Sequence, residues 1–272
     1  MNRGGFLEST VVGFSRTFSR ALTSEDIARK RGFLQSLDPR VRVVGLFSLV
    51  LAVTLSRKVS VVIILFGLSL VIAFSSSVSI TTLAKRVWLV VFAFTGVIAL
   101  PAIFITPGDA VATFAGGAVR ITAQGVATAE LLIARVETAV TLTTLLILCT
   151  PWTHVLKALR SFHLPQQAVA MLAMTHRYIF LLVETAGQMF ESRRSRRVGV
   201  LSGRAQRRVT ARTAGVLLSK SIELSNEVYL AMQSRGFQGE VYVLTDFRMQ
   251  AWDYIGLFVF LLAAAIAVWK GR

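Results

Sequence analysis

Five runs of residues without a charged side chain constrain the fold of this chain more than any motif does. A helix needs roughly 20 predominantly apolar residues to cross the hydrocarbon core of a bilayer. The pattern therefore predicts an all-α integral membrane protein with about five membrane-spanning helices, the fourth of them beginning in a Gly-interrupted stretch near Ile121. The uncharged runs are residues 43–56, 59–84, 87–108, 138–150 and 254–269.

Composition supports this placement. Hydrophobic residues make up 54% of the chain and charged residues 16%, with a mean hydropathy of +0.64, which excludes a soluble surface or a disordered chain of this length. The net charge of +16 must concentrate outside the apolar runs, where it suits anionic lipids or an acidic partner. The single cysteine, Cys149, excludes a disulfide or a cysteine-ligated metal site within the chain.

The first and last runs are short, and we expect them to extend through Arg42 and Asp253, whose side chains can reach the membrane interface. Residues 1–38 carry mixed charges and no continuous apolar stretch, so we expect a cytoplasmic arm without a cleavable signal peptide. Asp38 followed by Pro39 predicts the start of the first spanning helix, because Asp caps free N–H groups and Pro suits the first helical position.

The loops predict the orientation. Lys85 and Arg86, the N-terminal arm and the basic segment after Lys157 fall on one side if the helices alternate, and the Gly-rich loop at residues 107–117 falls on the other. The positive-inside rule makes the basic side cytoplasmic. Four cations lie on the opposite side and count against this orientation: Arg57, Lys58, Lys270 and Arg272.

Residues 151–250 have a different character and predict cytoplasmic amphipathic helices. Pro151 and Pro165 mark two helix starts, and a third helix is expected to end at Gly236, where a left-handed residue commonly stops a helix. An arginine-centred triplet ends each of the last two helices. On the first of these helices one face carries Leu182, Ala186, Met189, Arg193 and Arg196, and on the second a stripe carries Leu217, Leu218, Ser221, Leu224, Ser225, Val228, Met232 and Arg235.

Two interpretations of these arginines are open. A cation at a helix end favours the helix dipole and anionic lipid head groups. Alternatively, an exposed guanidinium inserts into a partner's groove, where its planar donors meet carboxylates or carbonyls. The recurrence of similar triplets at two helix ends favours the second interpretation.

The order of several short motifs resembles the transmembrane T component of energy-coupling factor (ECF) transporters, most closely its CbiQ-like branch associated with cobalt uptake. The resemblance extends from about Leu37 to Trp269, and the paired triplets are its most specific part. The motifs are Leu37-Asp38-Pro39-Arg40, Thr150-Pro151, Pro165, Arg177-Tyr178-Ile179 with Glu184, Ser195-Arg196-Arg197 and Ser234-Arg235-Gly236.

The resemblance implies docking of the two triplets into two ABC-type ATPase subunits, whose movement reorients a separate substrate-binding membrane subunit. Serine replaces the family's alanine in both triplets, and Arg197 replaces glycine in the first, so Arg193 or Arg194 remains an alternative contact there. The solute implied is cobalt, with nickel or a vitamin as alternatives. The implied location is the bacterial cytoplasmic membrane, with the N-terminus in the cytoplasm and lipids as further partners.

Catalytic and metal-binding functions find little support. No segment matches the phosphate-binding pattern G-x-x-x-x-G-K-[ST], so we expect a non-catalytic subunit without a cofactor. His154, His163 and His176 lack the spacing that gathers metal ligands on one helical turn. Asp109, Glu130, Glu137 and Asp253 are scattered and read as capping or interfacial groups. Arg135 and Glu137 are open between an interfacial role and an ion pair with another subunit.

Two other classes of protein are consistent with a basic membrane chain but have less support. A channel or autonomous transporter needs facing polar groups within its spans, and these spans offer little beyond serine and threonine. A membrane-anchored nucleic-acid binder would use the arginines on phosphates, but no aromatic residues interleave with them. The expected organisation is an arm at 1–38, four spans within 39–150, coupling helices within 151–250 and a last span within 251–272.

Overall fold

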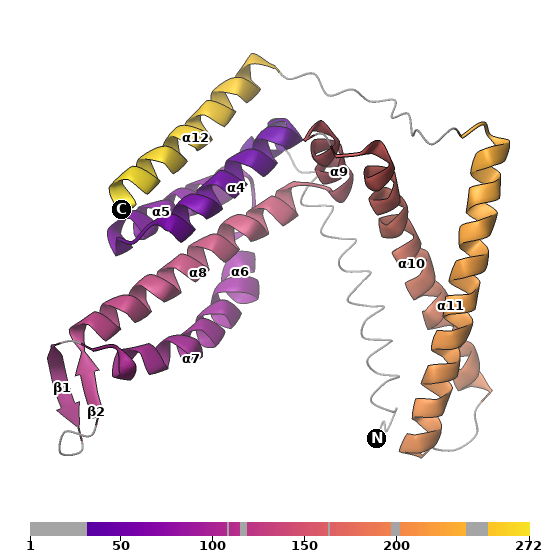
Figure 1. Cartoon of the computed structure of the whole chain (residues 1–272), viewed down its shortest axis with the longest axis horizontal. Coiled ribbons are helices and arrows are strands. Elements are labelled where there is room, and N and C mark those ends of the chain that lie inside the picture. Colours follow the sequence, from indigo (N-terminus) through magenta and orange to yellow (C-terminus); the bar gives the residue numbers. More distant parts are fainter. Residues whose placement is uncertain (1–31, 108, 115–118, 163, 197–201, 238–249) are drawn as a thin grey trace. The chain divides into compact units, whose positions relative to one another are not determined.

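A computed structural model of the 272-residue chain describes residues 32–107, 109–114, 119–162, 164–196, 202–237 and 250–272. The regular secondary structure of these residues is helical apart from one short hairpin (Figure 1). The chain divides into two compact units. The unit with residues 25–158 and 247–272 is called the bundle below, and the unit with residues 159–246 is called the helix pair.

Five long helices form the bundle, one from each uncharged run, and this confirms the expected all-α class. Within the bundle α8 packs against α4, α5 and α7, and α12 packs against α4. The elements are α3 (Phe33–Ser36), α4 (Pro39–Leu55), α5 (Val59–Ser75), α6 (Ile80–Leu83), the π-helical turn η1 (Ala84–Trp88), α7 (Leu89–Ile105), β1 (Ala110–Phe114), β2 (Val119–Thr122), α8 (Ala123–Cys149), α9 (Trp152–Ser161), α10 (Gln166–Ser195), α11 (Gly203–Ser234) and α12 (Ala251–Gly271).

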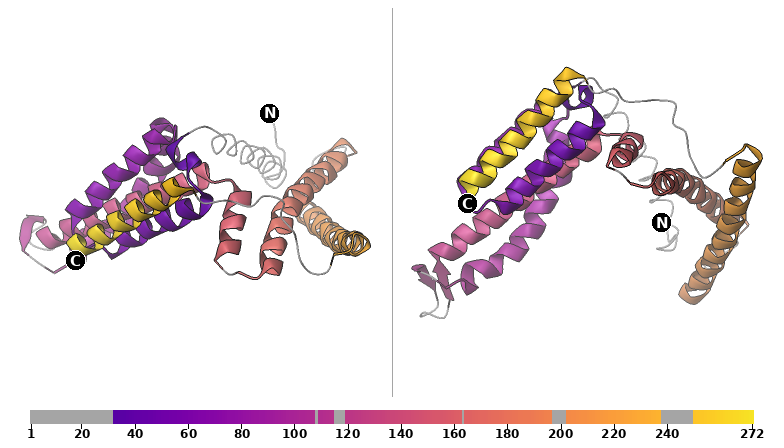
Figure 2. Two further views of the ribbon diagram at one scale, coloured as in Figure 1. Left: turned by 90° about the horizontal axis from the view of Figure 1, so that it is seen from above. Right: turned by 45° about the horizontal axis from the view of Figure 1, so that its top comes forward.

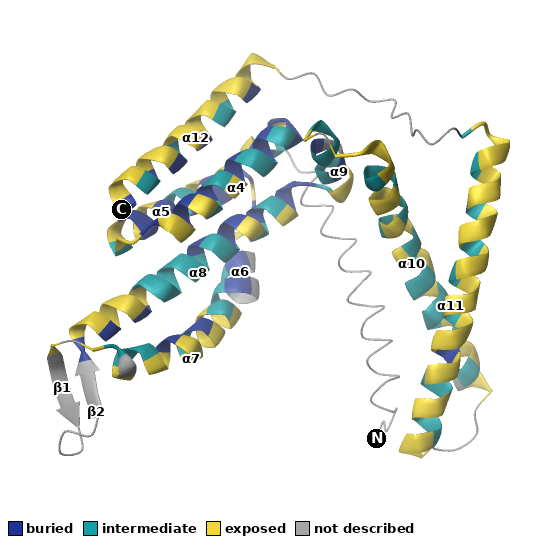
Figure 3. Ribbon diagram, viewed as in Figure 1, coloured by how far each residue is buried: buried dark blue, intermediate teal, exposed yellow. Residues whose placement is uncertain are grey.

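The outer surface of the bundle is apolar, as expected for helices that face lipid. The exposed residues of α7 include Phe92 and Phe94, and those of α12 include Phe258 and Trp269 (Figure 3). A helix pairs its backbone N–H and C=O groups with one another, so it can lie in the hydrocarbon core of a bilayer, which offers no hydrogen-bond partners. By length and composition, α8, α12 and residues 166–193 of α10 are long enough to cross a membrane, while α5 and α7 are shorter apolar helices.

Helix α4, the first long helix of the bundle, begins where the sequence predicts. A carboxylate oxygen of Asp38 accepts the backbone N–H of Arg40 at 2.9 Å, and Pro39 is the first helical residue. This satisfies one of the free donors that every helix start leaves.

The uncharged run at 59–84 is not one helix. It breaks after Ser75, and Ser77 adopts a left-handed φ of 54°, because the N–H groups of Ser77 and Val78 close the helix end onto the carbonyls of Phe74 and Ala73. Helical structure then resumes at Ile80 and continues through η1 into α7. Lys85 and Arg86, expected in a loop, therefore lie within a helical segment.

The Gly-rich loop expected between the third and fourth spans holds a β-hairpin. Strands β1 and β2 pair antiparallel, with Phe114 opposite Val119. The hairpin leads directly into α8, where Thr122 accepts the N–H of Gly125 at 3.1 Å and donates to the carbonyl of Thr106 at 2.9 Å. Thr122 therefore fastens the end of α7 to the start of α8.

Candidate docking site

The residues expected to dock a partner lie at the ends of α10 and α11, in the helix pair. Pro165 directly precedes α10, as predicted, and its carbonyl accepts the N–H of Ala168 at 3.0 Å. Leu182, Ala186, Met189 and Arg193 are all half-buried, whereas Arg196 at the end of their face is exposed. The apolar stripe therefore leads into a cation that faces outward.

The first triplet begins on the last residue of α10. The hydroxyl of Ser195 donates to the carbonyl of Ser192 at 2.9 Å, which anchors the serine to its own helix. Arg196 follows in a turn and is exposed, while Arg194 belongs to α10. Arg197 lies outside the described residues. The geometry thus offers Arg196 outward and keeps Arg193 half-buried.

The second helix of the pair begins with a cap. Ser202 precedes α11 and its hydroxyl accepts the N–H of Ala205 at 3.4 Å. The first turns carry exposed Arg204, Arg207 and Arg208. Thr213 is the only buried residue of α11, at 1% exposure, and α11 contacts α10. The two helices cross (Figures 1 and 2), so most of the surface of each is left uncovered.

The second triplet ends α11 in a complete Schellman motif. The N–H of Gly236 donates to the carbonyl of Gln233 at 2.9 Å, and the N–H of Phe237 donates to that of Met232 at 3.0 Å. Gly236 has a left-handed φ of 78°, which confirms the expected helix end. Ser234, Arg235 and Gly236 are all exposed.

The two triplets share local geometry. The hydroxyl of Ser234 donates to the carbonyl of Ala231 at 3.0 Å, as Ser195 does to the residue three positions earlier. In both triplets the serine hydroxyl therefore bonds the chain's own helix. A serine in place of alanine leaves the following arginine as the group presented outward.

The two arginines are far apart. Ser202 to Arg235 spans the length of α11, about 50 Å at 1.5 Å per residue. Arg196 and Ser202 are six residues apart in the sequence, and an extended chain covers at most about 20 Å over that separation. The Cα atoms of Arg196 and Arg235 are therefore separated by at least about 30 Å, so the two arginines do not form one cluster.

A buried arginine that sequence reasoning placed at the interface holds one end of the bundle together. The guanidinium of Arg42 is 4% exposed and donates to the carbonyls of Leu37 at 2.6 and 2.8 Å, Gln35 at 2.7 Å and Cys149 at 2.9 Å. It binds the start of α4 to the end of α8. The position of Arg42 at the edge of an apolar run marked it as unusual in the sequence. Its partners could not be predicted, because they are backbone carbonyls and no sequence pattern identifies them.

Asp253 is buried as well, at 6% exposure. One carboxylate oxygen accepts the N–H of Asp38 at 2.7 Å and the other accepts that of Gln250 at 2.9 Å. Asp253 thus caps its own helix, as expected for a capping group, and also ties the start of α12 to the start of α4. Its carboxylate is bonded to backbone groups of the protein and is not exposed at the surface of the bundle.

The opposite end of α4 is joined to the same two helices. The N–H of Arg57 donates to the carbonyl of Gly271 at 2.8 Å, and Arg135 of α8 donates to the carbonyl of Ser56 at 2.8 Å. Helix α12 therefore runs parallel to α4, and α8 runs antiparallel to it. The end of α8 and the start of α12 lie at the same end of the bundle.

The remaining polar candidates are not brought together. Arg135 and Glu137 do not bond to each other, and both carboxylate oxygens of Glu137 are buried without a hydrogen-bond partner among the described residues. His176 packs edge-on against Phe180, with ring centroids 4.8 Å apart, and His163 lies outside the described residues. Within the described part of the chain, no three His, Cys, Asp or Glu side chains gather as metal ligands would.

Comparisons with known proteins point to one family. The chain matches the model of the family described as CbiQ, cobalt transport protein, over residues 30–244, a range that includes both triplets. It is 28% identical over 237 residues to an uncharacterized protein of Methanocaldococcus jannaschii, covering 86% of this chain and 81% of that protein.

Two named relatives match as well. The cobalt transport protein CbiQ of Rhodobacter capsulatus is 30% identical over 170 residues, covering 62% of this chain and 69% of the relative. The energy-coupling factor transporter transmembrane protein EcfT of Listeria innocua serovar 6a is 24% identical over 236 residues, covering 82% of this chain and 86% of the relative.

Proposed function

The chain belongs to the CbiQ cobalt transport protein family, and from this premise we propose that it is the coupling subunit of an ECF-type importer. It is a multi-pass membrane protein of a transporter, similar to CbiQ and to EcfT. In the proposed role, two ABC-type ATPase subunits bind the ends of α10 and α11. Their movement reorients a substrate-binding membrane subunit that packs on the exposed apolar surface of the helix pair.

The proposed topology places residues 150–250 on one side of the membrane. Because the end of α8 and the start of α12 lie at the same end of the bundle, this segment crosses the bilayer an even number of times. A crossing by α10 would need a second crossing by α11. The many charges of α11, including Arg204, Arg207, Arg208 and Arg212, argue strongly against it.

The composition of α10 also favours a helix that lies outside the hydrocarbon core. Its apolar stretch has a mean hydropathy of 1.2, against 1.8 for α8 and 2.1 for α12. Arg177 and Glu184 lie close to its midpoint, where a charge in a spanning helix is most costly. We therefore assign α10 to the cytoplasmic side together with α11, since the arginines of both helices suit that side.

A single observation carries the docking proposal: two exposed arginines end two helices and lie at least about 30 Å apart. A lipid-facing basic patch would not require matched geometry at both ends. Two separate ATPase subunits would each hold one end. Arg196 and Arg235 can donate in pairs to carboxylates or to carbonyls at a helix end.

In this mechanism the chain transmits movement. ATP binding draws the two ATPase subunits together, and each pulls one arginine-tipped helix of a crossed pair. Helices α10 and α11 pivot against each other at their crossing near Thr213. The membrane subunit resting on them turns with the movement and exposes its solute to the cytoplasm.

Cobalt is the solute that the family supports best, since the family and one relative carry cobalt transport in their names. Nickel or a vitamin is the alternative, because the EcfT relative is named for energy coupling and not for a solute. The choice of solute belongs to the substrate-binding subunit in this proposal.

The test uses Arg196→Glu and Arg235→Glu in the complete transporter. Each change replaces a hydrogen-bond donor with a negative charge, which the expected carboxylates of the ATPase subunits would repel. Capture of ATPase subunits by the tagged chain should therefore fall at least tenfold, and cobalt uptake should stop. Arg212→Glu makes the same charge change at an exposed position of α11 and should leave both measurements unchanged. Capture that survives in both test variants would remove Arg196 and Arg235 from the proposed docking role.

A further inference from the structure

Four cations at one end of the bundle are not used by the proposed function. They oppose the positive-inside rule, and all are exposed. The bond between the Arg57 N–H and the Gly271 carbonyl holds the ends of α4 and α12 together, so these cations gather on one short rim. Residues 55–59 and 268–272 contain no acidic side chain to balance them. The cations are Arg57, Lys58, Lys270 and Arg272.

Helices α4 and α12 are in close contact at both ends of the seam between them. Towards the start of both helices, Phe260 lies on Gly45 so closely that an added Cβ would come within 2.6 Å of its ring. Leu37 closes the seam again at Gly256, where an added Cβ would lie 3.0 Å from it. At the other end of the seam, an added Cβ on Gly271 would lie 2.6 Å from the Ser56 hydroxyl oxygen.

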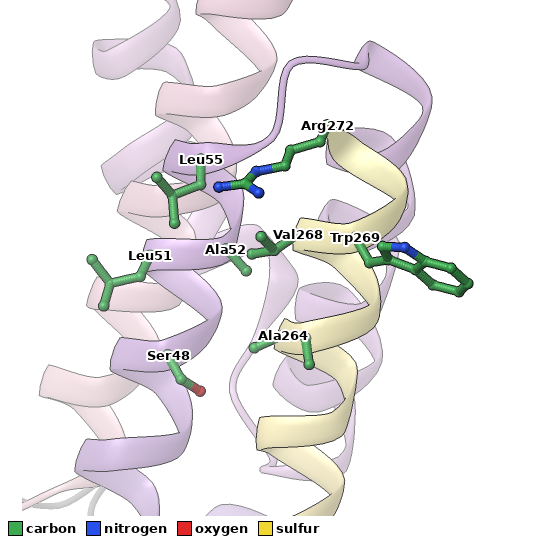
Figure 4. A pocket seen from close by; sticks show the side chains of 9 residues that line it. Ser48, Leu51, Ala52, Leu55, Ala264, Val268, Trp269 and Arg272 are labelled. Atoms are coloured by element: carbon green, nitrogen blue, oxygen red, sulfur yellow. The ribbon is translucent and has the colours of Figure 1, made fainter.

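A groove of about 460 Å³ lies along the seam between these contacts. Ala52 and Ala264 are buried at its base, while Leu51 and Leu55 stand exposed along its α4 side. Arg272 forms its end: Figure 4 shows this side chain reaching across from α12 towards Leu55, with Trp269 pointing away from the groove.

The groove covers about two thirds of the thickness of one membrane leaflet. Ser48 to Leu55 covers about 10 Å of helix, and half of the roughly 30 Å hydrocarbon core is about 15 Å. Its apolar length ends at the cationic rim, at the depth where lipid head groups begin. A partner's spanning helix would need contact along the full seam, which Phe260 and Leu37 close.

We propose that this groove binds one acyl chain of an anionic phospholipid, whose phosphate is held by Arg272 within the field of the other three cations. The apolar base and walls match a hydrocarbon chain, and a guanidinium is well suited to phosphate oxygens. The uncompensated positive charge of the rim matches an anionic head group and explains why cations lie on this side. Trp269, 82% exposed, suits the lipid interface.

Native mass spectrometry of the purified full chain tests the site. Phosphatidylglycerol should be retained by the wild type at concentrations at least tenfold lower than phosphatidylcholine with the same acyl chains. Ala265→Trp fills the groove from an exposed position of its lining and should weaken phosphatidylglycerol binding at least tenfold. Arg272→Gln should reduce phosphatidylglycerol binding to the level of phosphatidylcholine.

Matched variants separate the site from general effects. Ile266→Trp adds the same ring at the next exposed position of α12, outside the groove, and Lys220→Gln removes the same charge from α11; both should bind like the wild type. Unchanged binding in Ala265→Trp and Arg272→Gln would overturn the proposal. So would displacement of the lipid by inorganic phosphate, or an Ala265→Trp variant that keeps its lipid but no longer assembles with the substrate-binding subunit.

Discussion

Ser77 and Gly236 occupy the same position in the same helix-ending motif. Both have positive φ, 54° and 78°, and in both the next N–H reaches back to the carbonyl five residues before it. A residue with a Cβ loses roughly 1–2 kcal/mol in this conformation, which the closely packed end of α5 tolerates. At Gly236, at an exposed helix end, no packing offsets that cost.

We expect Gly236→Val to disturb the end of α11 through the backbone alone, since no atom lies within 4 Å of an added Cβ there. Capture of ATPase subunits by the tagged chain should drop several-fold. Gly236→Asn should retain capture, because asparagine tolerates the left-handed region. Gly215→Val places the same side chain in open space on the same helix and serves as the control. Full capture by Gly236→Val would contradict the capping role.

Helix α11 acts as a rod whose length and rotation set where Arg235 points. It has 32 residues, about 48 Å, and only Thr213 is buried along it. Each residue turns the helix by about 100°. The face that carries Arg235 is therefore fixed by the number of residues between the crossing and the helix end.

Insertions between Ser225 and Asn226, both exposed, should separate rotation from length. Two alanines rotate Arg235 by about 200° and four rotate it by about 40°, with a shift of about 6 Å. We expect the two-residue insertion to abolish cobalt uptake and the four-residue insertion to keep a measurable part of it. Equal uptake in the two variants would argue against a docking face defined by Arg235.

The whole molecule is organised by the parallel course of α4 and α12. Their starts are joined by Asp38 and Asp253 and their ends by Arg57 and Gly271, so a long polar segment must leave and return on one side. That segment contains α10 and α11 with their many arginines. The membrane potential and the anionic inner leaflet favour a cytoplasmic location for a segment with so many positive charges.

Cysteine labelling tests this topology. Cys149 is the only cysteine and is fully buried, so Cys149→Ser gives a silent background. In intact cells, a membrane-impermeant maleimide should label Lys58→Cys but not Gln188→Cys or Ser219→Cys, and permeabilised cells should label all three. Labelling of both Lys58→Cys and Ser219→Cys from outside would show that α10 crosses the membrane and would reverse the assignment of the helix pair.

Local chemistry made several features predictable from the sequence. Asp38 with Pro39, Pro165 and Gly236 each act on their own helix end, so their roles follow from neighbours a few residues away. The break at Ser77 was missed because serine carries no strong left-handed signal. The β-hairpin was missed because glycines near 116 read equally well as a loop.

The sequence alone establishes a helical membrane protein with an arginine-rich polar segment, because a helix that crosses a bilayer must be long and apolar and charged side chains are costly in the hydrocarbon core. Only the tertiary structure decided what Arg42 and Asp253 do and where the groove lies. Arg42 bonds a carbonyl 107 residues away and Asp253 an N–H 215 residues away. Such contacts depend on how helices pack, and no local pattern records them.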